Sequence, residues 1–160
     1  MEIERKFLVR QLPADLDGYP SRELEQGYLS VQPVVRVRRD GGSYYLTCKG
    51  KGKMAHEELE FPLTEESYLH LLTKADGRIL RKTRTCIPFG PYTIELDRFH
   101  GELEGRMLAE VEFPTEEEAI RFTPPAWFGK DVTEDRRCHN AWLASEPELP
   151  AELLLPGLTP

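Results

Sequence analysis

The segment "MEIERKFLV", residues 1–9, decides the fold because its charged residues recur at every second position. Glu2, Glu4 and Lys6 alternate with other residues, beginning with Ile3. A β-strand directs successive side chains to opposite faces, so two carboxylates and an ammonium group would share one face. Acidic residues are poor strand formers. We therefore expect a functional reason for their presence in this strand.

The overall composition suits a soluble globular protein with one domain. The chain has 160 residues, of which 39% are hydrophobic and 31% charged, and its formal net charge is −7. This negative charge argues against a nucleic-acid partner bound by bulk electrostatics. We expect a domain over residues 1–145, followed by a tail over 146–160 that contains four prolines.

The cysteines and the hydropathy pattern bear on the cellular compartment. Cys48, Cys86 and Cys138 are odd in number and lack paired metal-ligand spacing, which predicts free thiols in a reducing compartment. No apolar run approaches the length of a membrane span, and the charged start is unlike a secretory signal. We expect a cytoplasmic protein without a membrane partner, either a monomer or a homodimer.

Period-two segments separated by turn residues recur along the chain. They predict strands over residues 1–9, 23–31, 33–40, 43–50, 54–63, 78–87, 91–100 and 105–113. The turn "DGGS" at 40–43 is a strong hairpin signal. Short connections between so many strands predict a mainly β (α+β) fold, with an eight-stranded antiparallel sheet closed into a barrel. The order of the strands cannot be derived from the sequence.

Three helices are predicted beside these strands. The first follows Thr64 as N-cap, and the second follows Thr115, which has capping-box spacing to Glu118. The third follows Thr133 in "VTEDRRCHNAWLA". We expect these helices to cover the apolar exterior of the barrel.

Seven of the predicted strands carry polar or charged doublets with a spacing of two, so each doublet lies on one face of its strand. The signs of the charges segregate. The predicted strands at 1–9, 54–63, 91–100 and 105–113 are rich in carboxylates, whereas those at 33–40, 43–50 and 78–87 are basic. An ordinary sheet with one wetted face would usually mix its polar residues. Directly opposed like charges also cost stability, so these doublets favour a functional explanation.

The functional explanation is a barrel whose lumen is charged and wet. The lumen would hold six cationic side chains and eight acidic ones: Lys6, Arg36, Arg38, Lys49, Lys82 and Arg84, with Glu2, Glu4, Glu58, Glu60, Glu95, Asp97, Glu110 and Glu112. So many charges cannot be enclosed without a severe desolvation cost. A charged ligand should therefore occupy the lumen.

The types of side chain indicate which ligand this is. Arginines suit phosphate oxygens through forked hydrogen bonds. Clustered carboxylates suit a hard divalent cation, Mg²⁺ or Mn²⁺. The histidines are scattered without ligand spacing, so we predict no metal role for His56, His70, His100 or His139. The pattern predicts a site for a metal–polyphosphate complex.

These residues resemble a known family. "EIERK" at 2–6 matches the ExExK signature of the triphosphate tunnel metalloenzymes, or CYTH-domain proteins, and the similarity extends to about Ala144. Supporting matches are "QGYL" at 26–29, "VRVR" at 35–38, "YYLTCKG" at 44–50, "EELE" at 57–60, "RKTR" at 81–84, "IELDRFHG" at 94–101, "AEVEF" at 109–113 and "DVTEDRRCHNAWLA" at 131–144. One departure is Cys138, near which family members usually have a tyrosine.

The resemblance implies an eight-stranded tunnel that binds a triphosphate and a divalent metal. It implies metal ligands at Glu2, Glu4, Glu110, Glu112 and Asp97, and phosphate-binding bases at Lys6, Arg36, Arg38, Lys49, Lys82 and Arg84. It implies a catalytic set of Glu4, Lys6, Glu60 and Lys82. Glu58, Glu60, Glu95 and Asp97 match further tunnel acids that hold a second metal or orient the attacking water.

The resemblance to short bacterial triphosphatases makes inorganic tripolyphosphate the first expected substrate, with pyrophosphate and orthophosphate as products. Alternatives on the same fold are a nucleoside or thiamine triphosphatase and a class IV-type adenylyl cyclase. A non-catalytic polyphosphate-binding module would have intact bases and a broken metal cluster. Because the acidic residues are all present, hydrolysis is the preferred interpretation.

Overall fold

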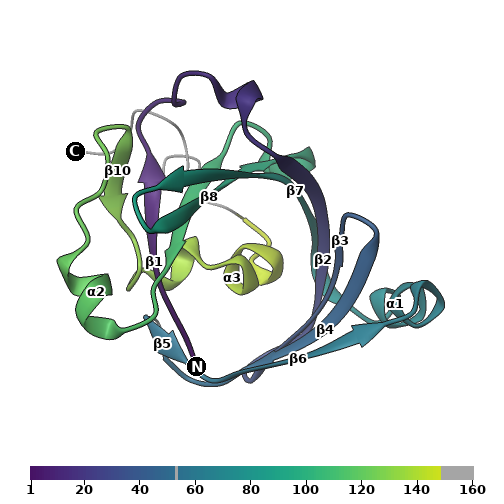
Figure 1. Ribbon diagram of the computed structural model, residues 1–160. Coiled ribbons are helices and arrows are strands. Elements are labelled where there is room, and N and C mark those ends of the chain that lie inside the picture. Colours follow the sequence, from purple (N-terminus) through teal and green to yellow (C-terminus); the bar gives the residue numbers. More distant parts are fainter. Residues whose placement is uncertain (53, 149–160) are drawn as a thin grey trace.

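The computed structural model describes residues 1–52 and 54–148, and the strands of this part form one curved antiparallel sheet (Figure 1). The predicted tail therefore lies mostly outside the described residues. The strands are β1 (Glu2–Val9), β2 (Ser21–Val31), β3 (Val34–Asp40), β4 (Ser43–Lys49), β5 (Ala55–His56), β6 (Glu58–Leu63), β7 (Asp76–Phe89), β8 (Tyr92–Phe99), β9 (Met107–Glu112) and β10 (Phe128–Asp131).

The sheet closes on itself. Its strands follow the order β10-β1-β9-β8-β7-β2-β3-β4-β6, and β5 pairs with β1. Only Glu57 separates β5 from β6, so one extended segment pairs with β4 at one end and with β1 at the other. We call the β1–β5 contact, with Glu2 opposite His56 and Ile3 opposite Ala55, the closing seam. The predicted eight-stranded closed barrel is confirmed, with β10 added beside β1.

The first two predicted helices are confirmed together with their caps. Helix α1 (Glu65–Leu72) begins after Thr64, whose hydroxyl oxygen accepts the Ser67 N–H at 3.1 Å. Helix α2 (Glu116–Arg121) begins after Thr115, whose hydroxyl oxygen accepts the Glu118 N–H at 3.2 Å. No helix in the described ranges is long and apolar enough to span a membrane.

The third prediction is wrong in its boundaries. A 3₁₀ turn at Arg136–Cys138 precedes α3 (Asn140–Ser145), so the helix starts well after Thr133. The Thr133 oxygen accepts the backbone N–H of Lys6 at 3.0 Å, and its hydroxyl donates to Asp131 at 2.6 Å. Thr133 therefore ties this segment to β1 instead of capping a helix. Two further 3₁₀ turns lie at Leu16–Gly18 and Gly101–Leu103.

The structure has two apolar clusters, one on the outer surface of the barrel and one at an end of its lumen. The outer cluster includes Phe7, Leu96 and Phe122, and it lies beneath α2 and β10. The inner cluster joins side chains from the same strands, such as Leu8 and Leu108, to helix α3 and the turn before it. Helix α3 therefore fills one end of the lumen, where Figure 1 shows it inside the ring of strands. The expectation that all three helices cover the exterior fails for α3.

One arginine on the outer face of β1 joins three elements. The Arg5 guanidinium pairs with Asp131 of β10 at 2.8 Å and donates to the carbonyl oxygens of Ala119 and Phe122 at 2.8 and 3.2 Å. Burial raises the pKa of Asp131, but hydrogen bonds from Thr133 and Arg5 outweigh it and hold that pKa below its ordinary value.

Asp131→Asn should lower the free energy of unfolding at pH 7 by about 1 kcal/mol, a small loss because the carboxylate is partly exposed. A carboxyl with a lowered folded-state pKa contributes stability above its unfolded pKa and loses it as the pH falls through the folded value. The difference between wild type and variant should therefore shrink as the pH falls below the ordinary aspartate pKa of about 3.9. Urea unfolding between pH 3 and 7 measures this, with Asp135→Asn as a control for a local surface pair. Equal stabilities of the Asp131 variant and wild type at pH 7 would contradict it.

Candidate functional site

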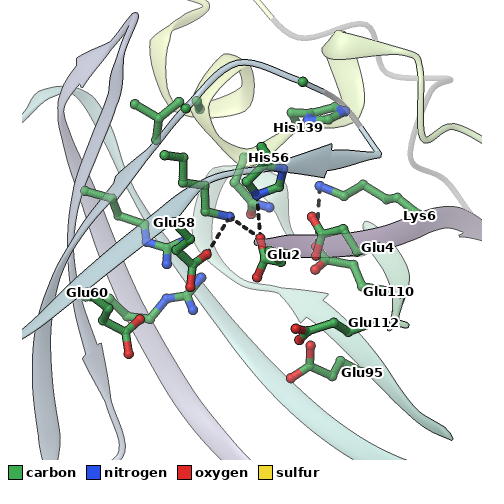
Figure 2. Close-up of a pocket in the computed structure, with 18 of the residues that line it drawn as sticks. Glu2, Glu4, Lys6, His56, Glu58, Glu60, Glu95, Glu110, Glu112 and His139 are labelled. Atoms are coloured by element: carbon green, nitrogen blue, oxygen red, sulfur yellow. Dashed lines mark hydrogen bonds and ion pairs between the residues drawn. The ribbon is translucent and has the colours of Figure 1, made fainter. Parts of the chain in front are cut away.

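The part of the lumen that α3 leaves open is a charged cavity of about 230 Å³ (Figure 2). It is lined by residues of the nine strands β1 to β9, by Gly50 and Gly52, and by residues at the start of α3. Seven carboxylates and five cationic side chains line it: Glu2, Glu4, Glu58, Glu60, Glu95, Glu110 and Glu112, with Lys6, Arg36, Arg38, Lys49 and Arg84. The structure thus brings together most of the residues expected from the sequence.

The strand order sorts these charges by sign. The strands that carry the carboxylates, β5/β6, β1, β9 and β8, are consecutive around the barrel. The basic strands β7, β3 and β4 follow on the other side, with β2 between β7 and β3. The lumen therefore has an acidic arc facing a basic arc. Lys6 is the exception, because it lies on β1 within the acidic arc.

Lys82 and Asp97 do not line the cavity. Both side chains are fully buried, and the Lys82 ammonium lies 2.7 Å from one Asp97 oxygen. Arg84 donates from Nε and Nη2 to the two Asp97 oxygens at 2.7 and 2.9 Å. Asn140 of α3 accepts a further hydrogen bond from Lys82 at 3.1 Å. Both oxygens of Asp97 are therefore engaged by cationic groups of the chain.

The acidic arc holds more negative charge than its neighbours neutralise. Glu4 lies directly opposite Glu112 in the sheet, and Glu95 lies opposite Glu110. Burial and the nearby Glu110 carboxylate raise the pKa of Glu4 to about 7. Burial and the surrounding carboxylates, Glu2 first among them, also raise the pKa of Glu112. A cation bound between opposed carboxylates of this kind reduces the repulsion between them.

Two carboxylates of the arc already have partners. Burial raises the pKa of Glu110, but the Lys6 ammonium at 3.4 Å and Arg84 outweigh it and hold that pKa well below its ordinary range. Burial likewise raises the pKa of Glu2, but His56 and Lys49 lower it to about 2. Glu2 and Glu110 are therefore ionised. Like Glu4 and Glu112, they line the cavity with carboxylate oxygens, the type of ligand that suits a hard divalent cation.

In the basic arc, positive charges lack negative partners. Arg36 donates from Nη2 to the Thr47 hydroxyl at 3.3 Å, and its Nε has no partner among the described residues. Arg38 donates from Nε to Gln26 at 2.9 Å. Within the described ranges, no carboxylate lies within ion-pair distance of either guanidinium. Burial and the neighbouring Arg36 lower the pKa of Arg38 to about 9. An anion in the cavity would pair with both guanidinium groups and reduce the repulsion between them.

The sequence analysis missed several groups that line or support the cavity: Gln26, Tyr28, His56, His139 and Asn140. His56 shares the alternation of Glu58 and Glu60, which is a signal that could have identified it. His139 and Asn140 reach the lumen only because α3 enters the barrel, and no local pattern indicates this. Burial and nearby Lys6 lower the pKa of His139 to about 4, so its ring is neutral at pH 7.

Comparison with known proteins identifies related chains. The CYTH domain family model matches residues 1–137. An inorganic triphosphatase of Nitrosomonas europaea is 41% identical over 149 residues, which cover 89% of this chain and 96% of that protein. An inorganic triphosphatase of Acetivibrio thermocellus is 35% identical over 155 residues, 91% and 94% of the two chains. A crystal structure of an inorganic triphosphatase has a TM-score of 0.69 at 38% identity, covering 92% and 97%.

Asp97→Asn should lower the free energy of unfolding by about 3 kcal/mol, because it leaves two buried cations without their shared carboxylate. Urea unfolding at pH 7 measures the loss. Glu60→Gln, a substitution at an exposed cavity carboxylate, serves as the matched control and should stay within about 0.5 kcal/mol of wild type. If the two variants were equally stable, Asp97 would not be a structural anchor.

Proposed function

Because this chain belongs to the CYTH domain family, we propose that it is a metal-dependent triphosphatase that splits inorganic tripolyphosphate into pyrophosphate and orthophosphate. One observation carries the proposal: an acidic arc short of cations faces two arginines that lack carboxylate partners. A linear polyphosphate bound with a divalent cation supplies both missing charges at once. The similar inorganic triphosphatases support the same substrate class.

We propose Glu2, Glu4, Glu110 and Glu112 as the residues that would hold Mg²⁺ or Mn²⁺. Their ligand atoms are all carboxylate oxygens, and the crowding of Glu4 against Glu110 and Glu112 is relieved by a cation. The family implies dependence on a divalent metal. When bound, the ion neutralises charge on phosphate oxygens and polarises the phosphorus–oxygen bonds.

The cationic side chains of the cavity would bind the phosphate oxygens. We assign this role to Lys6, Arg36, Arg38, Lys49 and Arg84, which all line the cavity. We assign Lys82 and Asp97 a positioning role instead, because Asp97 accepts two hydrogen bonds from the Arg84 guanidinium and Lys82 pairs with Asp97. Held in this way, Arg84 can stabilise the charge that develops on the transferred phosphoryl group.

The attacking water needs an acceptor that no cation already holds. Glu60 fits this role, because its side chain is exposed to the cavity and accepts only a 3.3 Å hydrogen bond from Thr47 among the described residues. The water oxygen would attack the terminal phosphorus while its proton is drawn toward Glu60. The anhydride bond to the next phosphate then breaks, and pyrophosphate leaves.

The lining favours an inorganic substrate over an organic triphosphate. Apart from the two histidines, Tyr28 is the single aromatic residue among the described residues of the cavity wall, and it is 3% exposed. A nucleobase or thiamine ring would therefore find little apolar surface beside the charged groups.

Phosphate release from tripolyphosphate, ATP and thiamine triphosphate, each with Mg²⁺, Mn²⁺ or EDTA, tests the proposal. We expect metal-dependent release from tripolyphosphate and little from the organic substrates. Cyclic AMP formed from ATP would instead indicate a cyclase. Tight tripolyphosphate binding without turnover under any condition would indicate a binding module.

Arg38→Ala should raise the KM for tripolyphosphate about tenfold or more, because it removes an arginine whose guanidinium lacks a carboxylate partner. Steady-state phosphate release measures this. Arg39→Ala is the matched control, since Arg39 is the next residue on β3 and its side chain is exposed, outside the cavity lining. An unchanged KM in the Arg38 variant would remove this residue from the phosphate site.

A further inference from the structure

A cluster with a nitrogen ligand lies directly on the closing seam. His56 of β5 faces Glu2 of β1 in register, and Glu58 follows two residues later. Figure 2 shows the His56 ring next to the Glu2 carboxylate, with Glu58 beside them. The three residues therefore come from both sides of the contact that closes the barrel.

The spacing of the ligand atoms fits one cation. His56 Nε2 lies 2.5 Å from Glu2 Oε1, and one ligand atom from each of the three residues lies within 4.8 Å of the others. Ligands about 2.1 Å from a metal ion are separated from each other by roughly 3 to 4 Å. Small side-chain rotations would bring the three groups to that spacing.

The cluster already attracts a positive charge. The Lys49 ammonium lies 3.3 Å from Glu2 Oε1 and 3.7 Å from Glu58 Oε2, between the two carboxylates. In the absence of a metal, Lys49 therefore serves as the counter-ion of this pair. A divalent cation would replace it and leave the ammonium free to contact phosphate.

The state of the His56 ring is a separate observation that points to a ligand. The residue is 5% exposed, and its Nδ1 has no hydrogen-bond partner among the described residues. Buried ring nitrogens are normally bonded. Among the described residues the ring is thus held only through the contact of Nε2 with Glu2, and Nε2 is the nitrogen that would bind a cation.

We propose that Glu2, His56 and Glu58 form a binding site for a first-row transition-metal divalent cation, in addition to the oxygen-only set of Glu2, Glu4, Glu110 and Glu112. An imidazole ligand favours Mn²⁺, Co²⁺ or Zn²⁺ over Mg²⁺, which prefers oxygen. The site overlaps the proposed function only in sharing Glu2, and it needs no substrate.

The position of the site gives the bound metal a structural role. The closing seam contains two register pairs and a hydrogen bond from the Glu4 N–H to the Met54 carbonyl at 2.9 Å. A cation held by β1 on one side and by β5 and β6 on the other would link the two edges. Its binding free energy then adds to the stability of the closed barrel.

Pulsed electron paramagnetic resonance of substrate-free protein loaded with Mn²⁺ tests the proposal directly, because it detects a nitrogen nucleus bonded to the metal. We expect a nitrogen signal in the wild type that disappears in His56→Gln. Calorimetric titration of His56→Gln should show Mn²⁺ affinity weakened about tenfold or more, with Mg²⁺ affinity changed less than about twofold. Mn²⁺ should also raise the melting temperature more in the wild type than in this variant.

His139→Gln is the matched control, since His56 and His139 are the two histidines among the described residues that line the cavity. The nitrogen signal should persist in it, which keeps the test decisive even if His56→Gln fails to fold. A wild type without the signal, a signal that survives in His56→Gln, or its loss in His139→Gln would overturn the proposal. Because no substrate is present, hydrolysis with Mg²⁺ alongside any of these results would leave the proposed function intact.

Discussion

The electrostatic constraint that shapes this protein is the enclosure of like charges in a narrow barrel. Opposed carboxylates such as Glu4 and Glu112 would repel one another at any pH where both are ionised, and Arg36 and Arg38 repel in the same way. Apart from Lys6, the strand order places the two signs on facing arcs. The chain's own charges do not neutralise either arc, so a ligand that carries both signs, such as the proposed metal with a polyphosphate, would stabilise the cavity.

A scaffold with such a lumen must draw its stability from elsewhere. The outer cluster around Phe7 and Phe122 buries apolar surface beneath α2 and β10. The inner cluster fills one end of the barrel with α3, which shortens the charged part of the lumen. Between the two environments lies Asp97, which carries Lys82 on one side and Arg84 on the other. Through Lys82 and Asp97, Asn140 of the packed end is connected to Arg84, which lines the cavity.

The closing seam links the fold to the site. The barrel is closed by a two-residue strand, and one of the two pairs that meet there, Glu2 with His56, lines the charged lumen. Lys49 serves as the counter-ion of Glu2 and Glu58. A cation that displaced Lys49 would strengthen the seam and release a base toward the phosphates. The same cation would then both stabilise the closed barrel and free Lys49 to bind phosphate.

The sequence by itself determined the eight strands of the barrel but not β10, as well as the faces on which their charges lie and the caps at Thr64 and Thr115, because alternation and capping depend on neighbouring residues. It also indicated the ligand class, since doublets of one sign on one face are a local pattern. It did not determine the strand order, and so could not show that the signs form facing arcs or that Asp97 and Lys82 lie behind the cavity wall. Nor could it show that His56 meets Glu2 across the seam or that α3 enters the lumen. Those features arise from contacts between residues far apart in the chain, which only tertiary packing decides.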